Sequence, residues 1–166
     1  MQTLPPSATE GAELHSLIAG FLERIHVMTI ATSNGDRPWT ATVYFAPDAD
    51  LHLYFVSNRQ SRHAQELRRN PWMAAALYDP SSPSGKARGL QIEGRAAAVE
   101  ALEFPRALST YSRRFPWAHE LASDPIQFLG AAAKARLFRV APDRMWYLDE
   151  ESFGPHGRRE WSRPAP

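Results

Sequence analysis

The sequence contains no cysteine, which excludes disulfide bonds and thiolate metal ligands. It also lacks any apolar run approaching the roughly 18 residues that a membrane-spanning helix needs. Its N-terminus shows no basic segment followed by an apolar one, the pattern of a secretory signal. These absences predict a cytoplasmic protein with no membrane partner.

Net charge is nearly absent as well, because the 166 residues carry a formal charge of +1 without a dense basic stripe. This argues against nucleic acid as a partner. A small barrel that binds RNA through arginine and exposed aromatic side chains stays open as an alternative from another functional class. Lysine is scarce, since only Lys86 and Lys134 stand against seventeen arginines. Arginine favours bidentate contacts with anions, but genomic base composition produces the same bias.

What the sequence does contain is an ordinary globular composition, 43% apolar and 22% charged, long enough for one domain with a real core. Apolar periodicity and turn residues predict helices over 12–24, 64–69 and 103–115, broken helical turns over 116–121 and near 124–125, and strands over 27–32, 39–45, 51–56, 72–78, 89–99, 136–140 and 145–148. Ser33 to Asp36 is a strong hairpin turn, because Asn34-Gly35 accepts positive φ at both centres. Residues 141–144 read as a turn.

These elements predict an α+β protein, a mainly antiparallel β-barrel of six or seven strands with peripheral helices. Gly94, midway along the 89–99 strand, indicates a bulge or a close backbone approach that a curved sheet needs. We expect a flexible arm over 1–11, the barrel domain over 12–150, and a tail over 151–166 with no clear contribution to the core.

The segment Ser57 to His63, between a predicted strand and a predicted helix, is the strongest candidate binding site. Ser61 is a plausible helix N-cap, and hydroxyls, backbone N–H groups and two cationic side chains converge there. Such a point suits a phosphate, because a helix N-terminus favours an anion. The alternative is a strand-to-helix turn whose basic residues are simply solvated.

The order of these signals resembles the pyridoxamine 5′-phosphate oxidase-like flavoproteins, the FMN-binding split barrels. The resemblance runs over 25–99 and more weakly over 138–148. It is carried by the hairpin Thr29 to Thr32 with Gly35 to Pro38, by Ser57-Asn58 with Ser61-Arg62-His63 and Asn70-Pro71, and by the strand Gly89 to Gly94. Arg88 to Gln91 and Ser112 to Pro116 further resemble a small bacterial branch of these barrels, which implies no known substrate.

The resemblance implies cofactor-binding roles for particular residues of this chain. Thr42, Val43 and Tyr44 match the strand that lies along the flavin ring, and Ser57, Ser61 and Arg62 match residues that reach the phosphate. His63 stands where the family often has lysine, and beside a phosphate its pKa should rise. Ala41 replaces an arginine that is common in the family.

Two more positions complete the implied cofactor site. Gly89 stands where a flavin-contacting glutamine is common, while Gln91 faces the same side two residues later and reaches a similar region. Trp146 matches late-strand aromatics that lie near the cofactor of the partner subunit. The substrate signature of pyridoxamine phosphate oxidase is not recognisable in Glu160 to Arg163, so we infer a different protein of the same family.

The resemblance therefore implies an FMN-dependent oxidoreductase that exchanges hydride at flavin N5 with an unknown small molecule, built as a homodimer with the flavin at the interface. The alternative is a protein that binds or senses a flavin, a deazaflavin or haem without turnover. The histidines at 26, 52, 63, 119 and 156 fit no dense metal motif, so we expect no metal site. No Ser-His-Asp set or carboxylate pair emerges, and no catalytic residue is assigned.

Overall fold

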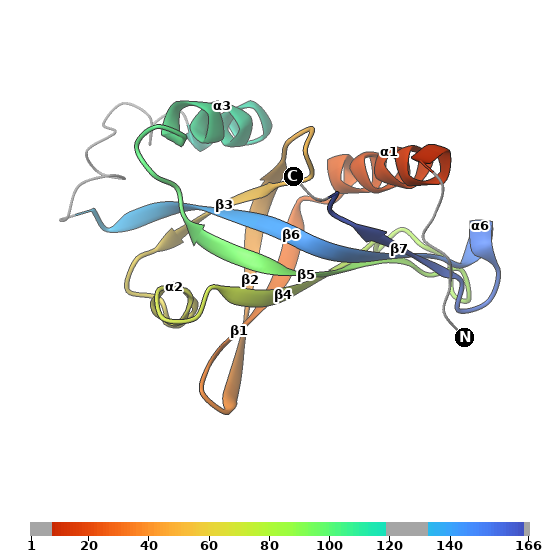
Figure 1. Cartoon of the computed structure of the whole chain (residues 1–166), viewed down its shortest axis with the longest axis horizontal. Helices are drawn as coiled ribbons and strands as arrows, with labels where there is room; N and C mark the ends of the chain where they lie inside the picture. The colour runs from red at the N-terminus through yellow and green to blue at the C-terminus, as the bar shows by residue number, and fades with distance from the viewer. Residues whose placement is uncertain (1–7, 119–132, 165–166) are drawn as a thin grey trace.

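The computed structural model describes residues 8–118 and 133–164 (Figure 1). Its helices are α1 (Ala8–Arg24), α2 (Arg62–Leu67), α3 (Phe104–Arg114), the 3-10 turn η1 (Pro116–Ala118) and α6 (Glu150–Phe153). Its strands are β1 (Val27–Asn34), β2 (Arg37–Pro47), β3 (Leu53–Asn58), β4 (Trp72–Tyr78), β5 (Arg88–Ala98), β6 (Ala135–Asp149) and β7 (Arg158–Ser162).

The strands form a closed antiparallel ring. Their order is β3-β2-β1-β4-β5-β6-β7, and β3 also pairs with β6, so six strands close on themselves and β7 lies outside on β6. Figure 1 shows α1 and α3 along one side of this ring and α2 on the other. The predicted α+β antiparallel barrel with peripheral helices is confirmed.

Two apolar clusters hold the elements together. The larger fills the barrel and joins the buried face of α1, which carries Leu14, Ile18, Phe21 and Leu22, to inward side chains such as Phe55 and Phe138. The smaller lies between α3 and the outer side of β3 and β6, and includes Tyr54, Tyr111 and Leu137. No helix in the described part of the chain is long and apolar enough to cross a bilayer.

The β1–β2 hairpin is present, but its turn differs from the prediction by one position. Asn34 pairs with Arg37, so the two loop residues are Gly35 and Asp36. Of the four turn residues only Gly35 has a positive φ, 81°. The expectation of positive φ at Asn34 is therefore wrong, because a two-residue loop with its first position at positive φ needs glycine there alone.

Strand β6 is continuous where the sequence predicts two strands and a turn at 141–144. Glu93 pairs with Arg144 and Gly94 with Pro142, so Asp143 is an extra residue in the ladder. A Cβ on Gly94 would lie 2.5 Å from the Ala141 carbonyl oxygen, so only glycine permits this approach. The bulge predicted at Gly94 is confirmed, and it absorbs the residues that read as a turn.

The two ends of the barrel domain also differ from expectation. α1 begins at Ala8, so part of the predicted arm is helical. The expectation that the tail adds nothing to the core is wrong, because β7 pairs with β6 and Trp161 is buried in the main cluster. The helical turns predicted for 119–121 and 124–125 lie outside the described residues.

Candidate functional site

A compact hydrogen-bonded group joins the end of β3 to the start of α2. His63 Nε2 lies 2.6 Å from Ser57 Oγ and 3.1 Å from Ser61 Oγ, and the two hydroxyl oxygens are 3.2 Å apart. We call Ser57, Ser61 and His63 the hydroxyl–imidazole cluster. Three residues that the sequence assigns to phosphate binding are therefore brought together.

The local sequence explains why these groups converge. Ser61 adopts extended backbone angles as the N-cap of α2, and its Oγ accepts a hydrogen bond from the Ala64 N–H at 3.4 Å. α2 then turns His63, Ala64 and Leu67 toward the barrel core, so the imidazole is buried beside Phe55. α2 is only six residues long, so its N-terminus adds little anion affinity and the side chains must supply it.

The protein surroundings favour a neutral His63. Burial lowers the pKa of the imidazole, and the nearby Glu66 carboxylate opposes this shift only partly. The sequence led us to expect a raised pKa beside a phosphate, whereas the groups that the chain itself supplies act in the other direction. His63 thus contributes a hydrogen bond rather than a fixed charge.

Arg62 is held outside the hydroxyl–imidazole cluster. Its Nε donates to Glu66 Oε1 at 2.8 Å, and its guanidinium lies 4.7 Å from the centre of the Trp39 ring. Glu66 is buried and also accepts a hydrogen bond from Thr32 Oγ1 at 2.6 Å, and these two bonds keep its pKa low. In this arrangement the Arg62 charge is matched by Glu66.

Two cationic residues that the sequence analysis missed, Lys134 and Arg136, lie across from the segment that carries Ser57 and Arg59. The β3–β6 ladder pairs Ser57 with Arg136, and two positions further along the Arg59 N–H donates to the Lys134 carbonyl at 2.9 Å. Local sequence gives no signal of this proximity, because residues 134–136 follow a long intervening segment. Only the register of the closing strands reveals it.

Gln91 and Trp146 belong to a different surface. They face each other across β5 and β6, and the Trp146 indole N–H donates to Glu160 Oε2 at 3.3 Å. Both line a cavity of about 600 Å³ on the outer face of the sheet, together with Thr29, Ala31, Thr40, Ala74, Ala76, Glu93 and Arg158 among others. We call this the outer groove.

The strand predicted to lie along a flavin ring borders this groove. Val43 points into the core, whereas Thr42 and Tyr44 point outward. Thr42 pairs with Thr29, which lines the outer groove, and the Tyr44 ring packs on Phe115 with centroids 5.6 Å apart. The nine predicted residues thus divide between the barrel end, the β2 strand and the outer groove.

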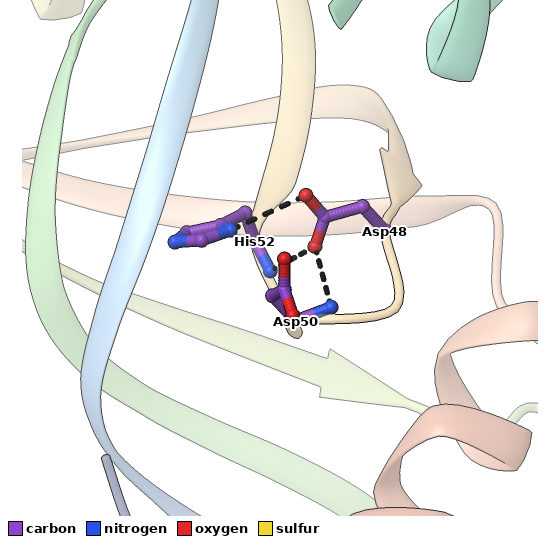
Figure 2. A group of neighbouring side chains, drawn as sticks. All are labelled: Asp48, Asp50 and His52. Atoms are coloured by element: carbon purple, nitrogen blue, oxygen red, sulfur yellow. Dashed lines mark hydrogen bonds and ion pairs between the residues drawn. The ribbon is translucent and has the colours of Figure 1, made fainter. Parts of the chain in front are cut away.

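Asp48, Asp50 and His52 form a separate polar group in the β2–β3 loop (Figure 2). Asp48 Oδ1 accepts the backbone N–H groups of Asp50 and His52 at 2.9 Å, and Asp48 Oδ2 lies 3.2 Å from His52 Nδ1. Burial alone would raise the pKa of the Asp48 carboxyl, but the hydrogen bonds from His52 and Tyr54 outweigh this effect, so the pKa of Asp48 lies below its ordinary value.

The Arg106 guanidinium bridges both carboxylates of this group, at 3.3 Å from Asp48 and 3.0 Å from Asp50. One cation from α3 therefore already contacts both carboxylates and offsets part of their negative charge. We interpret the group as the structure that orders the loop rather than as a metal centre.

With this geometry in view, the relationship to known proteins can be stated. The family model described as pyridoxamine 5′-phosphate oxidase matches residues 14–149. The chain belongs to this family. It is a pyridoxamine 5′-phosphate oxidase-like protein rather than that enzyme itself. A UPF0306 protein of Photorhabdus laumondii is 29% identical over 111 residues, which cover 66% of this chain and 76% of that protein.

Solved structures of pyridoxamine 5′-phosphate oxidase-like proteins show the same fold. A haem binding protein from Mycobacterium smegmatis superposes with a TM-score of 0.69 at 18% identity, covering 96% of this chain and 60% of that one. A putative pyridoxamine 5′-phosphate oxidase from Listeria innocua gives a TM-score of 0.59 at 23% identity, covering 81% of this chain and 98% of that one. At these identities the likeness establishes the fold alone.

Proposed function

We propose that this pyridoxamine 5′-phosphate oxidase-like protein binds FMN and acts as an oxidoreductase on a small molecule. The observation that carries the proposal is the hydroxyl–imidazole cluster, in which two hydroxyls and one imidazole lie within hydrogen-bonding distance of one another. A phosphate monoester accepts hydrogen bonds from donors such as hydroxyl and imidazole N–H groups. The residues of this chain therefore fit the phosphate end of FMN.

The outer groove fits a planar ring. Its volume of about 600 Å³ falls within the range of ligand pockets, and its alanines leave the backbone open to a flat ligand. Gln91 would supply an amide to the polar edge of a flavin, and Trp146 an aromatic surface. A bound flavin supplies hydride exchange at N5, while the protein binds it, orients it and leaves the groove open to a substrate.

We further propose that the protein works as a homodimer through the outer face of β1 and β4. Val27, Trp72 and Tyr78 are exposed there, and Ala76 borders both the outer groove and a second cavity of about 490 Å³. Exposed apolar surface of this kind favours a protein partner. Light scattering should give a dimer that Ala76→Arg converts to monomer, with Ser109→Arg on α3 as the control; a wild-type monomer would contradict the proposal.

The central experiment combines flavin titration with reduction kinetics. We expect FMN to bind the purified protein, and NADPH or NADH to reduce the bound flavin before an acceptor reoxidises it. Ser57→Ala should weaken FMN binding roughly ten- to hundredfold, because it removes a hydrogen bond to a charged phosphate. Ser109→Ala, on the exposed side of α3, should leave binding unchanged. Absence of FMN binding would overturn the proposal, and binding without reduction would favour a storage or sensing role.

Haem or deazaflavin binding without turnover is the second candidate. The fold is shared over 96% of this chain with a protein described as haem binding. The exposed His26 lines the second cavity with Val27 and Tyr78, and a histidine is a common axial ligand of haem. A haem titration that produces a Soret shift abolished by His26→Ala, but kept in His156→Ala, would favour this function over the flavin proposal.

A further inference from the structure

The pairing of β3 with β6 places Ser57 and Arg136 on one rung of the barrel. Phe55 and Phe138, two residues further into the ladder, face the core and stack with ring centroids 5.0 Å apart. Side chains alternate along a strand, so Ser57 and Arg136 point to the same side as these rings. The intervening pair, Val56 and Leu137, packs on the α3 side instead.

The ladder continues for one further step beyond the strand ends. The Arg59 N–H donates to the Lys134 carbonyl at 2.9 Å, which keeps the two backbones paired. Arg59 lies two positions beyond Ser57, and Lys134 two positions before Arg136, so this bond holds both residues next to the end of the ladder that carries Ser57 and Arg136. One cationic residue, Arg136, thus lies on the rung that carries Ser57, and Arg59 and Lys134 lie two positions beyond it.

The electrostatic setting of Arg136 agrees with this placement. Burial lowers the pKa of its guanidinium, and the positive charge of Arg59 lowers it further. The hydroxyl–imidazole cluster begins at the same rung, because Ser57 Oγ lies 2.6 Å from His63 Nε2.

We propose that Arg136, with Arg59 and Lys134, forms the cationic side of a phosphate site whose hydrogen-bonding side is the hydroxyl–imidazole cluster. The ligand group is a phosphate monoester, and this inference rests on the proposed function in taking that monoester to be the phosphate of FMN. The site needs this second side, because neutral His63 and two hydroxyls supply no charge. Arg62 already balances Glu66 through a 2.8 Å contact.

The test compares FMN with riboflavin, which lacks the phosphate. In Arg136→Gln we expect FMN affinity to fall roughly ten- to hundredfold, the scale of a charge-assisted hydrogen bond, and riboflavin affinity to stay constant. Arg136→Lys should retain most of the preference for FMN, which separates charge from folding. The matched control is Arg139→Gln on the same strand, where the guanidinium contacts Glu103 on the α3 side at 3.1 Å. Unchanged FMN affinity in Arg136→Gln, or an equal loss for both flavins, would overturn the inference.

A second measurement keeps the inference separate from the proposed function. Inorganic phosphate is titrated into the wild-type protein and Arg136→Gln, and amide and imidazole NMR signals of residues 57–63 are followed. We expect saturable shifts in the wild type that are lost in Arg136→Gln and kept in Arg139→Gln. If the protein binds no flavin but shows these shifts, the proposed function fails and the phosphate site stands. If flavin binds and Arg136→Gln changes neither measurement, the proposed function stands and the phosphate site at Arg136 fails.

Discussion

Replacing Glu66 alone should destabilise the protein more than replacing Glu66 and Thr32 together. The Glu66 carboxylate is buried at 5% exposure and accepts one hydrogen bond from Thr32 and one from Arg62. Methionine has a similar length and no polar atom at its end, so Glu66→Met removes both bonds with little change in volume. Thr32, at 3% exposure, then keeps a buried hydroxyl without its acceptor.

The size of this destabilisation follows from the surroundings of Glu66 and Thr32. Each hydrogen bond to a charged group contributes about 1.5–3 kcal/mol, and an unsatisfied buried hydroxyl costs about 1–3 kcal/mol. The protein recovers part of this, because it no longer desolvates a carboxylate, and Arg62 is exposed enough to be solvated. We expect Glu66→Met to lower the free energy of unfolding by about 2–4 kcal/mol. The double variant with Thr32→Val should lie within about 1 kcal/mol of wild type, since both partners are then apolar.

Urea unfolding monitored by tryptophan fluorescence measures all four members of this double-mutant cycle. The expected coupling between positions 32 and 66 is at least about 1–3 kcal/mol, which is the difference between the Glu66→Met and double variants before the cost of Thr32→Val is added. Thr32→Val alone should cost less than Glu66→Met. Additive effects within about 0.5 kcal/mol would refute the reasoning, because they would mean that the Thr32 hydroxyl does not depend on Glu66.

Three further outcomes test other parts of the structure. Gly94→Ala should lower the free energy of unfolding by about 1–3 kcal/mol, because its Cβ would meet a carbonyl oxygen of β6 at 2.5 Å. Gly11→Ala in α1, with open space around it, should raise the free energy of unfolding by about 0.5–1 kcal/mol. Chemical denaturation measures the sign of both changes. Trp161→Ala should lower the free energy of unfolding by about 3–5 kcal/mol, and an equal loss from the half-exposed Trp72→Ala would show that burial is not the cause. Because burial lowers the pKa of His63 below its ordinary 6.5, the unfolded chain takes up the proton first. Stability should therefore be full above pH 6.5 and decline as pH falls below it, and His63→Gln should flatten that part of the thermal-melting profile.

Much of the barrel could be predicted from local sequence. Alternating apolar residues identify the strands, and Ser61 before a run of helix formers identifies the start of α2. The series of six or seven short strands joined by turns predicted a barrel, and the resemblance to a known family agreed with that prediction. These features are local, or they are fixed by the order of elements along the chain.

The remaining features depend on pairing register, which local patterns do not determine. Pro142 and Asp143 are typical of a turn, yet the close approach allowed by Gly94 places them inside a strand. β7 buries one side chain, Trp161, among exposed polar neighbours, so its sequence reads as a tail. Arg136 joins the candidate site only because β6 pairs with β3.

The same pairing has a consequence for how the protein folds. β6 is the strand that converts an open sheet into a ring, and it comes late in the chain, so β3 and β5 are unpaired edges until it arrives. Ser57 and Arg136 lie on the two strands, β3 and β6, whose pairing closes the ring. A ligand that contacts both would bind only the closed ring, and would stabilise it by mass action in proportion to the logarithm of ligand concentration. An anion held there would therefore stabilise the β3–β6 pairing, which is the last pairing that closes the barrel.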